Sequence, residues 1–170
     1  MGEQPIKLLL IENDPEDADL VQEMLAEDRN FSFHVEWVDR LEKGLARLAQ
    51  GGIDVVLLDL NLPDSVGLET FVKVRMQSAQ AAVVILTGSY LDQQWALAAV
   101  QEGAQDYLEK SEVKGKMLAR ILVYAVERKK EEERSRQAYQ DLEKRFKALQ
   151  NLIKSSPDMA TLRKEAEKSQ

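Results

Sequence analysis

Four apolar stretches of this 170-residue chain are followed or ended by side chains that could act on a phosphorylated ligand. These side chains are the group Glu12, Asn13 and Asp14, the carboxylate of Asp59, the hydroxyl of Thr87 and the amine of Lys110. Carboxylate and carbonyl oxygens are the ligands that Mg²⁺ prefers, and ammonium groups donate strong hydrogen bonds to phosphoryl oxygens. Each residue alone could be an ordinary solvated strand end, whereas the four positions together predict a magnesium and phosphoryl site.

The elements that would position these side chains alternate regularly along the chain. Short apolar runs predict strands at Ile6–Ile11, Phe33–Val38, Val55–Leu60, Val83–Thr87 and Asp106–Leu108. Segments of helical period predict helices at Glu16–Asp28, Leu41–Gln50, Leu68–Gln77, Leu91–Glu102 and from near Lys116. This alternation predicts an α/β fold with a doubly wound five-stranded parallel sheet. Ligands of such sheets bind outside the carboxyl ends of the strands, where the four positions lie.

Charge and composition exclude several other classes of protein. The net charge of −7 and the isoelectric point near 4.9 argue against binding to nucleic acid or to an anionic membrane, because both require clustered Lys and Arg. The chain has no cysteine, so it can form neither a disulfide nor a thiolate metal site. Its apolar runs are too short to cross a bilayer and its N-terminus lacks a signal pattern, so we expect a soluble, cytoplasmic protein.

A resemblance to the receiver domain of two-component response regulators is carried by four stretches, LLLIENDPEDADLV, DVVLLDLNLPDSVGLE, VVILTG and GAQDYLEKSE. Their order and spacing match over about residues 5–126, which we expect to form the receiver domain. The resemblance implies a flavodoxin-like strand order of 2-1-3-4-5. It also implies that Asp59 accepts a phosphoryl group from a sensor histidine kinase or a phosphotransfer protein. Catalysis would then be limited to the chain's own phosphorylation and dephosphorylation, and the protein would not be a conventional enzyme.

The same resemblance assigns roles to the other site residues. It implies that Mg²⁺ is held by Glu12, Asn13, Asp59 and the backbone carbonyl of Asn61, and that Thr87 and Lys110 bind phosphoryl oxygens. Tyr107 matches the aromatic residue that swings inward in this family and changes the face made by helix four, strand five and helix five. The alternative interpretation of Tyr107 is an ordinary, half-exposed strand aromatic.

Asn13 departs from the family pattern, which usually has an acidic pair at the positions of Glu12 and Asn13. An amide oxygen can coordinate Mg²⁺ but lacks the charge of a carboxylate, so we expect weaker binding of the metal. Asp14 is the candidate for a compensating acid. The alternative function is a phosphorylation-independent, receiver-like protein-interaction module with a degraded metal site. A small-molecule enzyme is disfavoured because the chain has no nucleotide-binding glycine loop.

The last third of the chain predicts a separate element. Residues 127–155 are mostly charged and contain no glycine or proline, which is typical of a solvated helix that continues the fifth helix of the domain. Within it, apolar residues recur at alternating spacings of three and four, the pattern of a coiled coil, at Tyr139, Leu142, Phe146, Leu149 and Ile153. This extension predicts either a homodimer through the helix or a monomer with a solvated linker. The polar residues 156–170 predict either a disordered tail or the start of a further domain.

Overall fold

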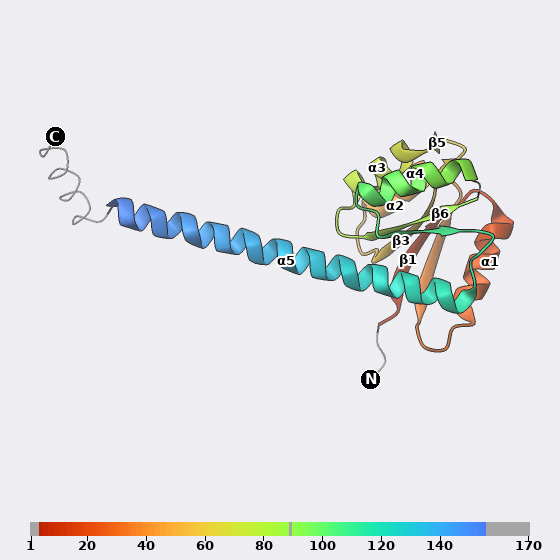
Figure 1. The fold of residues 1–170 in the computed structure, drawn as a ribbon. Helices are drawn as coiled ribbons and strands as arrows, with labels where there is room; N and C mark the ends of the chain where they lie inside the picture. Colours follow the sequence, from red (N-terminus) through yellow and green to blue (C-terminus); the bar gives the residue numbers. More distant parts are fainter. Residues whose placement is uncertain (1–3, 89, 156–170) are drawn as a thin grey trace, which may run out of the picture. The chain divides into compact units, whose positions relative to one another are not determined.

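A computed structural model describes residues 4–88 and 90–155 of the chain (Figure 1). The strands are β1 (Ile6–Ile11), β2 (Phe33–Val38), β3 (Val55–Asp59), β4 (Asn61–Leu62), β5 (Ser65–Val66), β6 (Ala82–Thr87) and β7 (Asp106–Glu109). The helices are α1 (Pro15–Ala26), α2 (Leu41–Leu48), α3 (Leu68–Gln77), α4 (Tyr90–Gln101) and α5 (Gly115–Ser155). Five parallel strands form one sheet in the order β2-β1-β3-β6-β7, which confirms the predicted α/β fold and the order 2-1-3-4-5.

The predicted elements differ from the observed ones mainly at their ends. The first helix begins at Pro15 and ends at Ala26, two residues before the predicted end, and β3 ends at Asp59 itself. The sequence did not predict the small antiparallel ribbon of β4 and β5, in which Asn61 pairs with Val66. Strands of two residues are too short for a periodic pattern to reveal.

Two apolar clusters hold the central sheet between helices. Leu9, Ile11, Leu58 and Ile85 point to the side covered by α2, α3 and α4. Alternate residues of the same strands point to the other side, where they contact α1 and the first part of α5 (Figure 1). Because β3 and β6 are buried along their whole length, their sequences are continuous apolar runs rather than alternating ones.

The parallel register brings the carboxyl ends of the strands, which carry the polar residues, together on one side of the sheet. We call this side the strand-end edge. Ile11 pairs with Leu58, and Asp59 pairs with Leu86 one position further along. On the next strand, Thr87 pairs with Glu109, the residue before Lys110. The residues that follow β1, β3, β6 and β7 therefore lie beside one another.

Two aspartates fix the starts of helices near this edge. Asp14 is the N-cap of α1, where its Oδ1 accepts a hydrogen bond of 2.9 Å from the backbone N–H of Glu16. Asp64, in the turn between β4 and β5, accepts hydrogen bonds of 2.9 Å from the N–H groups of Leu41 and Glu42 at the start of α2. Burial alone would raise the pKa of Asp64, but these two N–H donors hold it below its ordinary value.

The described residues fall into two compact units, with the boundary after Lys130. From Glu131 to Ser155 the second unit is helical and exposed, and pairs of opposite charge connect successive turns, such as Arg145 with Asp141 and Lys147 with Glu143. The predicted tail of residues 156–170 lies outside the described residues. Between residues 4 and 155, with residue 89 left aside, no helix combines the length and apolar character needed to span a membrane.

We expect Asp64→Ala to lower the free energy of unfolding by about 1 kcal/mol at neutral pH, because α2 loses its N-terminal cap. Urea denaturation followed by circular dichroism measures this change. Glu69→Ala is the matched control, because it removes an exposed acid from the first turn of α3 and should change stability by less than about 0.5 kcal/mol. Equal stabilities of the two variants would show that the cap contributes nothing.

Candidate functional site

The ammonium of Lys110 lies at the centre of the strand-end edge. Its Nζ is 2.7 Å from Oε2 of Glu12, 2.8 Å from Oδ2 of Asp17 and 2.8 Å from Oδ2 of Asp59. These carboxylates come from the end of β1, the first turn of α1 and the end of β3. The Lys110 side chain is only 19% exposed, so the contacts form in a partly desolvated environment where charges interact more strongly than in water.

Glu12 is fully buried, which is unusual for a carboxylate. Its Oε1 accepts a hydrogen bond of 3.0 Å from the N–H of Asp14. Its Oε2 has no partner with hydrogen-bond geometry, although the ammonium of Lys110 lies within ion-pair distance. Burial, and then the negative charge of Asp59, raise the pKa of Glu12 from 4.5 to about 7. Glu12 therefore binds a proton more readily than an ordinary carboxylate does.

Lys110 shows the opposite balance between burial and charge. Burial alone would lower its pKa, because it disfavours the charged form. Close contacts with the carboxylates of Asp17, Asp59 and Glu12 outweigh this effect and raise the pKa of Lys110 above its ordinary value. Lys110 is therefore an ammonium at any physiological pH and provides a fixed positive charge beside Asp59.

Asp59 is nearly buried and both of its oxygens are engaged. Oδ2 faces Lys110, while Oδ1 accepts a hydrogen bond of 2.8 Å from the N–H of Asn61. The loop that follows is closed by a 2.7 Å hydrogen bond from the N–H of Gly67 to the carbonyl of Leu60. Gly67 has a φ of 77°, which favours glycine. The carboxylate of Asp59 is thus held by a tightly closed turn.

Asp17 is the site residue that sequence analysis missed. It lies three positions after the α1 N-cap Asp14, and helical side chains point back toward the N-terminus of their helix, which here faces the strand ends. That direction, combined with the Pro15 start signal, is the sequence feature that could have identified it. Asn13 and Asp14 are exposed at the rim, and the Oδ1 of Asp14 is engaged by the α1 cap.

Thr87 lies on β6, the strand next to β3, and Tyr107 lies on β7, the strand beyond β6. The Thr87 hydroxyl is buried and donates a hydrogen bond of 3.3 Å to the carbonyl of Leu108, and the Thr87 carbonyl accepts one of 2.8 Å from the N–H of Lys110. Tyr107 is 40% exposed on β7, which matches an outward-facing aromatic. The structure therefore brings Glu12, Asp59 and Lys110 into direct contact and places Thr87 on the adjoining strand.

The carboxylate, amide and carbonyl oxygens at this edge are the kind of ligand that a hard divalent cation such as Mg²⁺ binds. Within the described residues no three carboxylate, imidazole or thiolate groups are arranged around a metal position, and the ammonium of Lys110 lies between the carboxylates instead. However, the buried Oε2 of Glu12 lacks a hydrogen-bond donor and lies in the same cluster as Asp59. A buried, unsatisfied carboxylate oxygen is costly unless a positive charge satisfies it, which suits a cation.

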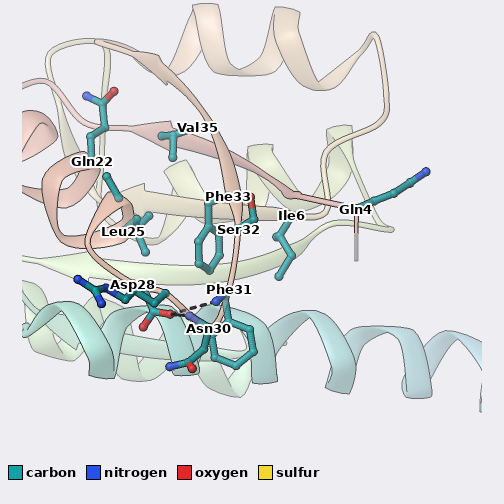
Figure 2. Close-up of a pocket in the computed structure, with 12 residues that line it drawn as sticks. Gln4, Ile6, Gln22, Leu25, Asp28, Asn30, Phe31, Ser32, Phe33 and Val35 are labelled. Atoms are coloured by element: carbon teal, nitrogen blue, oxygen red, sulfur yellow. Dashed lines mark hydrogen bonds between the residues drawn. The ribbon is translucent and has the colours of Figure 1, made fainter. Parts of the chain in front are cut away.

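A larger cavity lies at the opposite edge of the sheet and is distinct from this site. It has a volume of about 880 Å³ and is lined by the start of β1 and β2 and by the end of α1, as Figure 2 shows. One of its walls is the turn in which Asp28 accepts hydrogen bonds from the N–H groups of Asn30 and Phe31. Since parallel strands have their carboxyl ends at the other edge, this cavity does not contain the strand-end residues.

The chain belongs to the response regulator receiver family. A sequence profile described as the response regulator receiver domain matches residues 8–122. The cell cycle response regulator CtrA of Brucella ovis is 32% identical over 123 residues, which cover 68% of this chain and 48% of that protein. The chain therefore spans about half the length of the curated relatives it matches. Receiver domains typically bind Mg²⁺, and membership of the family implies a histidine kinase partner in general.

Solved structures are similar over the same region. A response regulator receiver domain protein from Clostridium thermocellum is 28% identical, with a TM-score of 0.65 over 74% of this chain and 97% of that chain. The signal receiver domain of an HD domain-containing protein from Pseudomonas fluorescens Pf-5 has a TM-score of 0.68 over 79% of this chain and 96% of that chain. At 21% identity, this second likeness shows the shared fold alone.

We expect the stability of the metal-free protein to fall as the pH rises from about 4.5 to about 7. The raised pKa of Glu12 means that the folded state binds a proton in this range that the unfolded chain releases. The resulting loss in the free energy of unfolding is on the order of 2 kcal/mol. Urea denaturation at several pH values, with a chelator present, measures it.

The variant Glu12→Gln should show a flatter pH dependence of stability, because it removes the titrating group. Glu16→Gln, an exposed acid in the first turn of α1, is the matched control and should keep the wild-type slope. If Glu12→Gln and the wild type have the same slope, another group causes the pH dependence.

Proposed function

We propose that this receiver accepts a phosphoryl group on Asp59 from a sensor histidine kinase or a phosphotransfer protein. The observation that carries the proposal is the 2.8 Å contact between Asp59 and the ammonium of Lys110, at the strand-end edge and beside the buried Glu12. A nucleophilic carboxylate at the carboxyl ends of parallel strands lies where ligands of such sheets bind, and a fixed cation beside it reduces its repulsion toward the negatively charged donor.

The reaction forms a bond between an Asp59 oxygen and phosphorus while the bond from phosphorus to the donor's histidine nitrogen breaks. Oδ2 of Asp59 is the proposed nucleophile, because Oδ1 is held by the N–H of Asn61. That hydrogen bond orients the carboxylate, which lowers the entropic cost of reaching the reactive geometry. The product is an aspartyl phosphate.

The neighbouring side chains would hold the phosphoryl group after transfer. Lys110 turns from the Asp59 carboxylate to a phosphoryl oxygen, which is a stronger acceptor of charge-assisted hydrogen bonds. Thr87 exchanges its long hydrogen bond to the Leu108 carbonyl for another phosphoryl oxygen. Asp17 remains as the solvent-side partner of Lys110 and keeps the ammonium in the site during the exchange.

Mg²⁺ would be held by Glu12, Asp59, Asn13 and the backbone carbonyl of Asn61, and would supply positive charge that stabilises the transferring phosphoryl group. Asn13 contributes an amide oxygen there and no charge. Asp14 is the proposed compensating acid, and its second carboxylate oxygen would have to serve because Oδ1 caps α1. Asp17 adds a further carboxylate beside these residues, because its side chain contacts Lys110.

We propose that phosphorylation is read out on the face formed by α4, β7 and α5. Inward movement of Thr87 would leave room for Tyr107 to leave its exposed position, since the two residues lie on adjacent strands. The C-terminal helix would transmit the change. The proposed location is the cytoplasm, where sensor kinases present their phosphohistidine.

A phosphorylation-independent interaction module is the second candidate. The exposed amide of Asn13, the capping role of Asp14 and the three-way pairing of Lys110 favour it, because together they describe a site stable without metal or phosphate. In that case the acids would maintain the fold of the edge and binding would occur through the surface helices alone.

Incubation with a small phosphodonor and Mg²⁺ should add the mass of one phosphoryl group to the intact protein. Asp59→Asn should abolish the addition, because the amide is not a nucleophile for this reaction. Asp19→Asn, an exposed acid on α1, is the matched control and should be phosphorylated like the wild type. Failure of the wild type to gain mass at any magnesium concentration would support the interaction module.

Asn13→Asp should increase the Mg²⁺ affinity by roughly tenfold, because it adds a charged oxygen ligand. Isothermal titration calorimetry measures the dissociation constant directly. Gln101→Glu, which adds one negative charge at the far end of α4, is the matched control and should leave the affinity unchanged. Equal affinities of the wild type and Asn13→Asp would show that position 13 does not contact the metal.

A further inference from the structure

The second unit of the chain exposes a continuous apolar stripe. Five side chains on α5 are between 54% and 73% exposed, and we call them the α5 seam: Tyr139, Leu142, Phe146, Leu149 and Ile153. Their alternating spacings of three and four place them on one face of a helix. Large apolar side chains grouped in this way in water mark a surface for a partner.

The rest of the helix surface is adapted to water. Ion pairs between successive turns, including Arg134 with Glu131 and Arg145 with Asp141, lie among exposed residues. Such pairs stabilise a solvated helix by a few tenths of a kcal/mol each. The α5 seam, with the exposed Leu152 beside it, is therefore the apolar surface on the helical part of the second unit that the structure describes.

We propose that the α5 seam binds the same seam of a second copy of this chain, as a parallel two-stranded coiled coil. In heptad terms, Tyr139, Phe146 and Ile153 take the a positions, and Leu142 and Leu149 take the d positions. Leucine at both d positions, with the β-branched Ile153 at one of the three a positions, favours two parallel strands over larger assemblies. The aromatic a positions add apolar area to a short seam.

One pair of opposite charges, in the heptad directly before the seam, favours a second copy in the parallel orientation. In a parallel pair, the g position of one helix meets the following e position of the other, so Glu131 faces Arg136 of the second copy. Arg145 in the same way faces the polar Gln150. These pairs arise only from the chain's own sequence, which makes the surface self-complementary.

One antiparallel register is disfavoured by residues that flank the seam. In the antiparallel register that aligns Tyr139 with Leu149, the two copies of Glu143 lie close together, as do the two copies of Arg145. Like charges at these positions oppose association. The parallel dimer requires neither Asp59 nor Mg²⁺, so the test of the dimer is independent of the test of phosphorylation.

Analytical ultracentrifugation of the full chain over a wide concentration range tests the surface. We expect a reversible dimer in the wild type and a loss of association by about 30-fold or more in Leu142→Glu/Leu149→Glu, because the change places unpaired charges in the interface. Ala148→Glu/Asn151→Glu adds the same charge on the opposite face and should dimerise like the wild type. Circular dichroism checks that both variants remain helical.

Disulfide formation tests the orientation, since the chain has no cysteine of its own. Ser135 is at the d position before the seam, so Ser135→Cys should cross-link two parallel chains under mild oxidation. In an antiparallel pair centred on the seam the two sulfurs would be roughly 30 Å apart. Gln137→Cys, at the outward f position, is the control and should remain uncross-linked.

Each result is decisive for one part of the proposal. A wild type that stays monomeric at every concentration, or a dimer that survives Leu142→Glu/Leu149→Glu, overturns the seam as the self-association surface. A dimer that depends on the seam but fails to cross-link through Ser135→Cys overturns the parallel orientation. Dimerisation that Asp59→Asn leaves intact, together with cross-linking, supports the proposal whatever the outcome of the phosphorylation test.

Discussion

A single ammonium holds the strand-end edge of this receiver together. Glu12 and Asp59 are carboxylates at or near full burial, and burial together with the negative charge of Asp59 raises the pKa of Glu12. Lys110 makes the arrangement possible because it meets both of them, and Asp17 as well, within 2.8 Å. Removing one partner of a buried ion pair leaves an uncompensated charge, so the three acids and Lys110 depend on one another. The closed turn after Asp59 and the cap of α1 keep their backbones in place.

Much of this architecture could be predicted from the sequence. The alternation of apolar runs and helical segments predicted the sheet, and strand ends at Asp59 and Thr87 indicated the correct edge. Asp64 could not be found in this way, and the direction of the first helix could place Asp17 near the strand ends but could not show its contact with Lys110, because both roles depend on long-range contacts. Asp64 caps a helix that begins 23 residues earlier in the chain, and Asp17 meets a lysine 93 residues away. The periodicity of apolar residues predicts which face of a helix or strand a residue occupies. It does not predict which distant residue the side chain contacts.

The two units of the chain are stabilised by different kinds of interaction. In the receiver unit, apolar clusters on both faces of the sheet bury nearly every residue of β3 and β6. The helical extension has no such core, and its stability as an isolated helix comes from propensity and pairs of opposite charge, which are individually weak. A helix of this kind gains most from association, so its behaviour depends on protein concentration in a way that the receiver's does not.

The two tryptophans are intrinsic fluorophores at the strand-end edge. The indole N–H of Trp37 donates a 2.8 Å hydrogen bond to the backbone carbonyl of Glu12, which ties the edge strand β2 to the residue that follows β1. Trp95, on α4, packs against Gly67 so closely that a Cβ there would lie 3.3 Å from its ring. The indole of Trp37 thus contacts Glu12, and the indole of Trp95 contacts the turn after Asp59. Movement of either segment changes the surroundings of an indole, so the summed emission of the unlabelled protein responds to movement on both sides of the site.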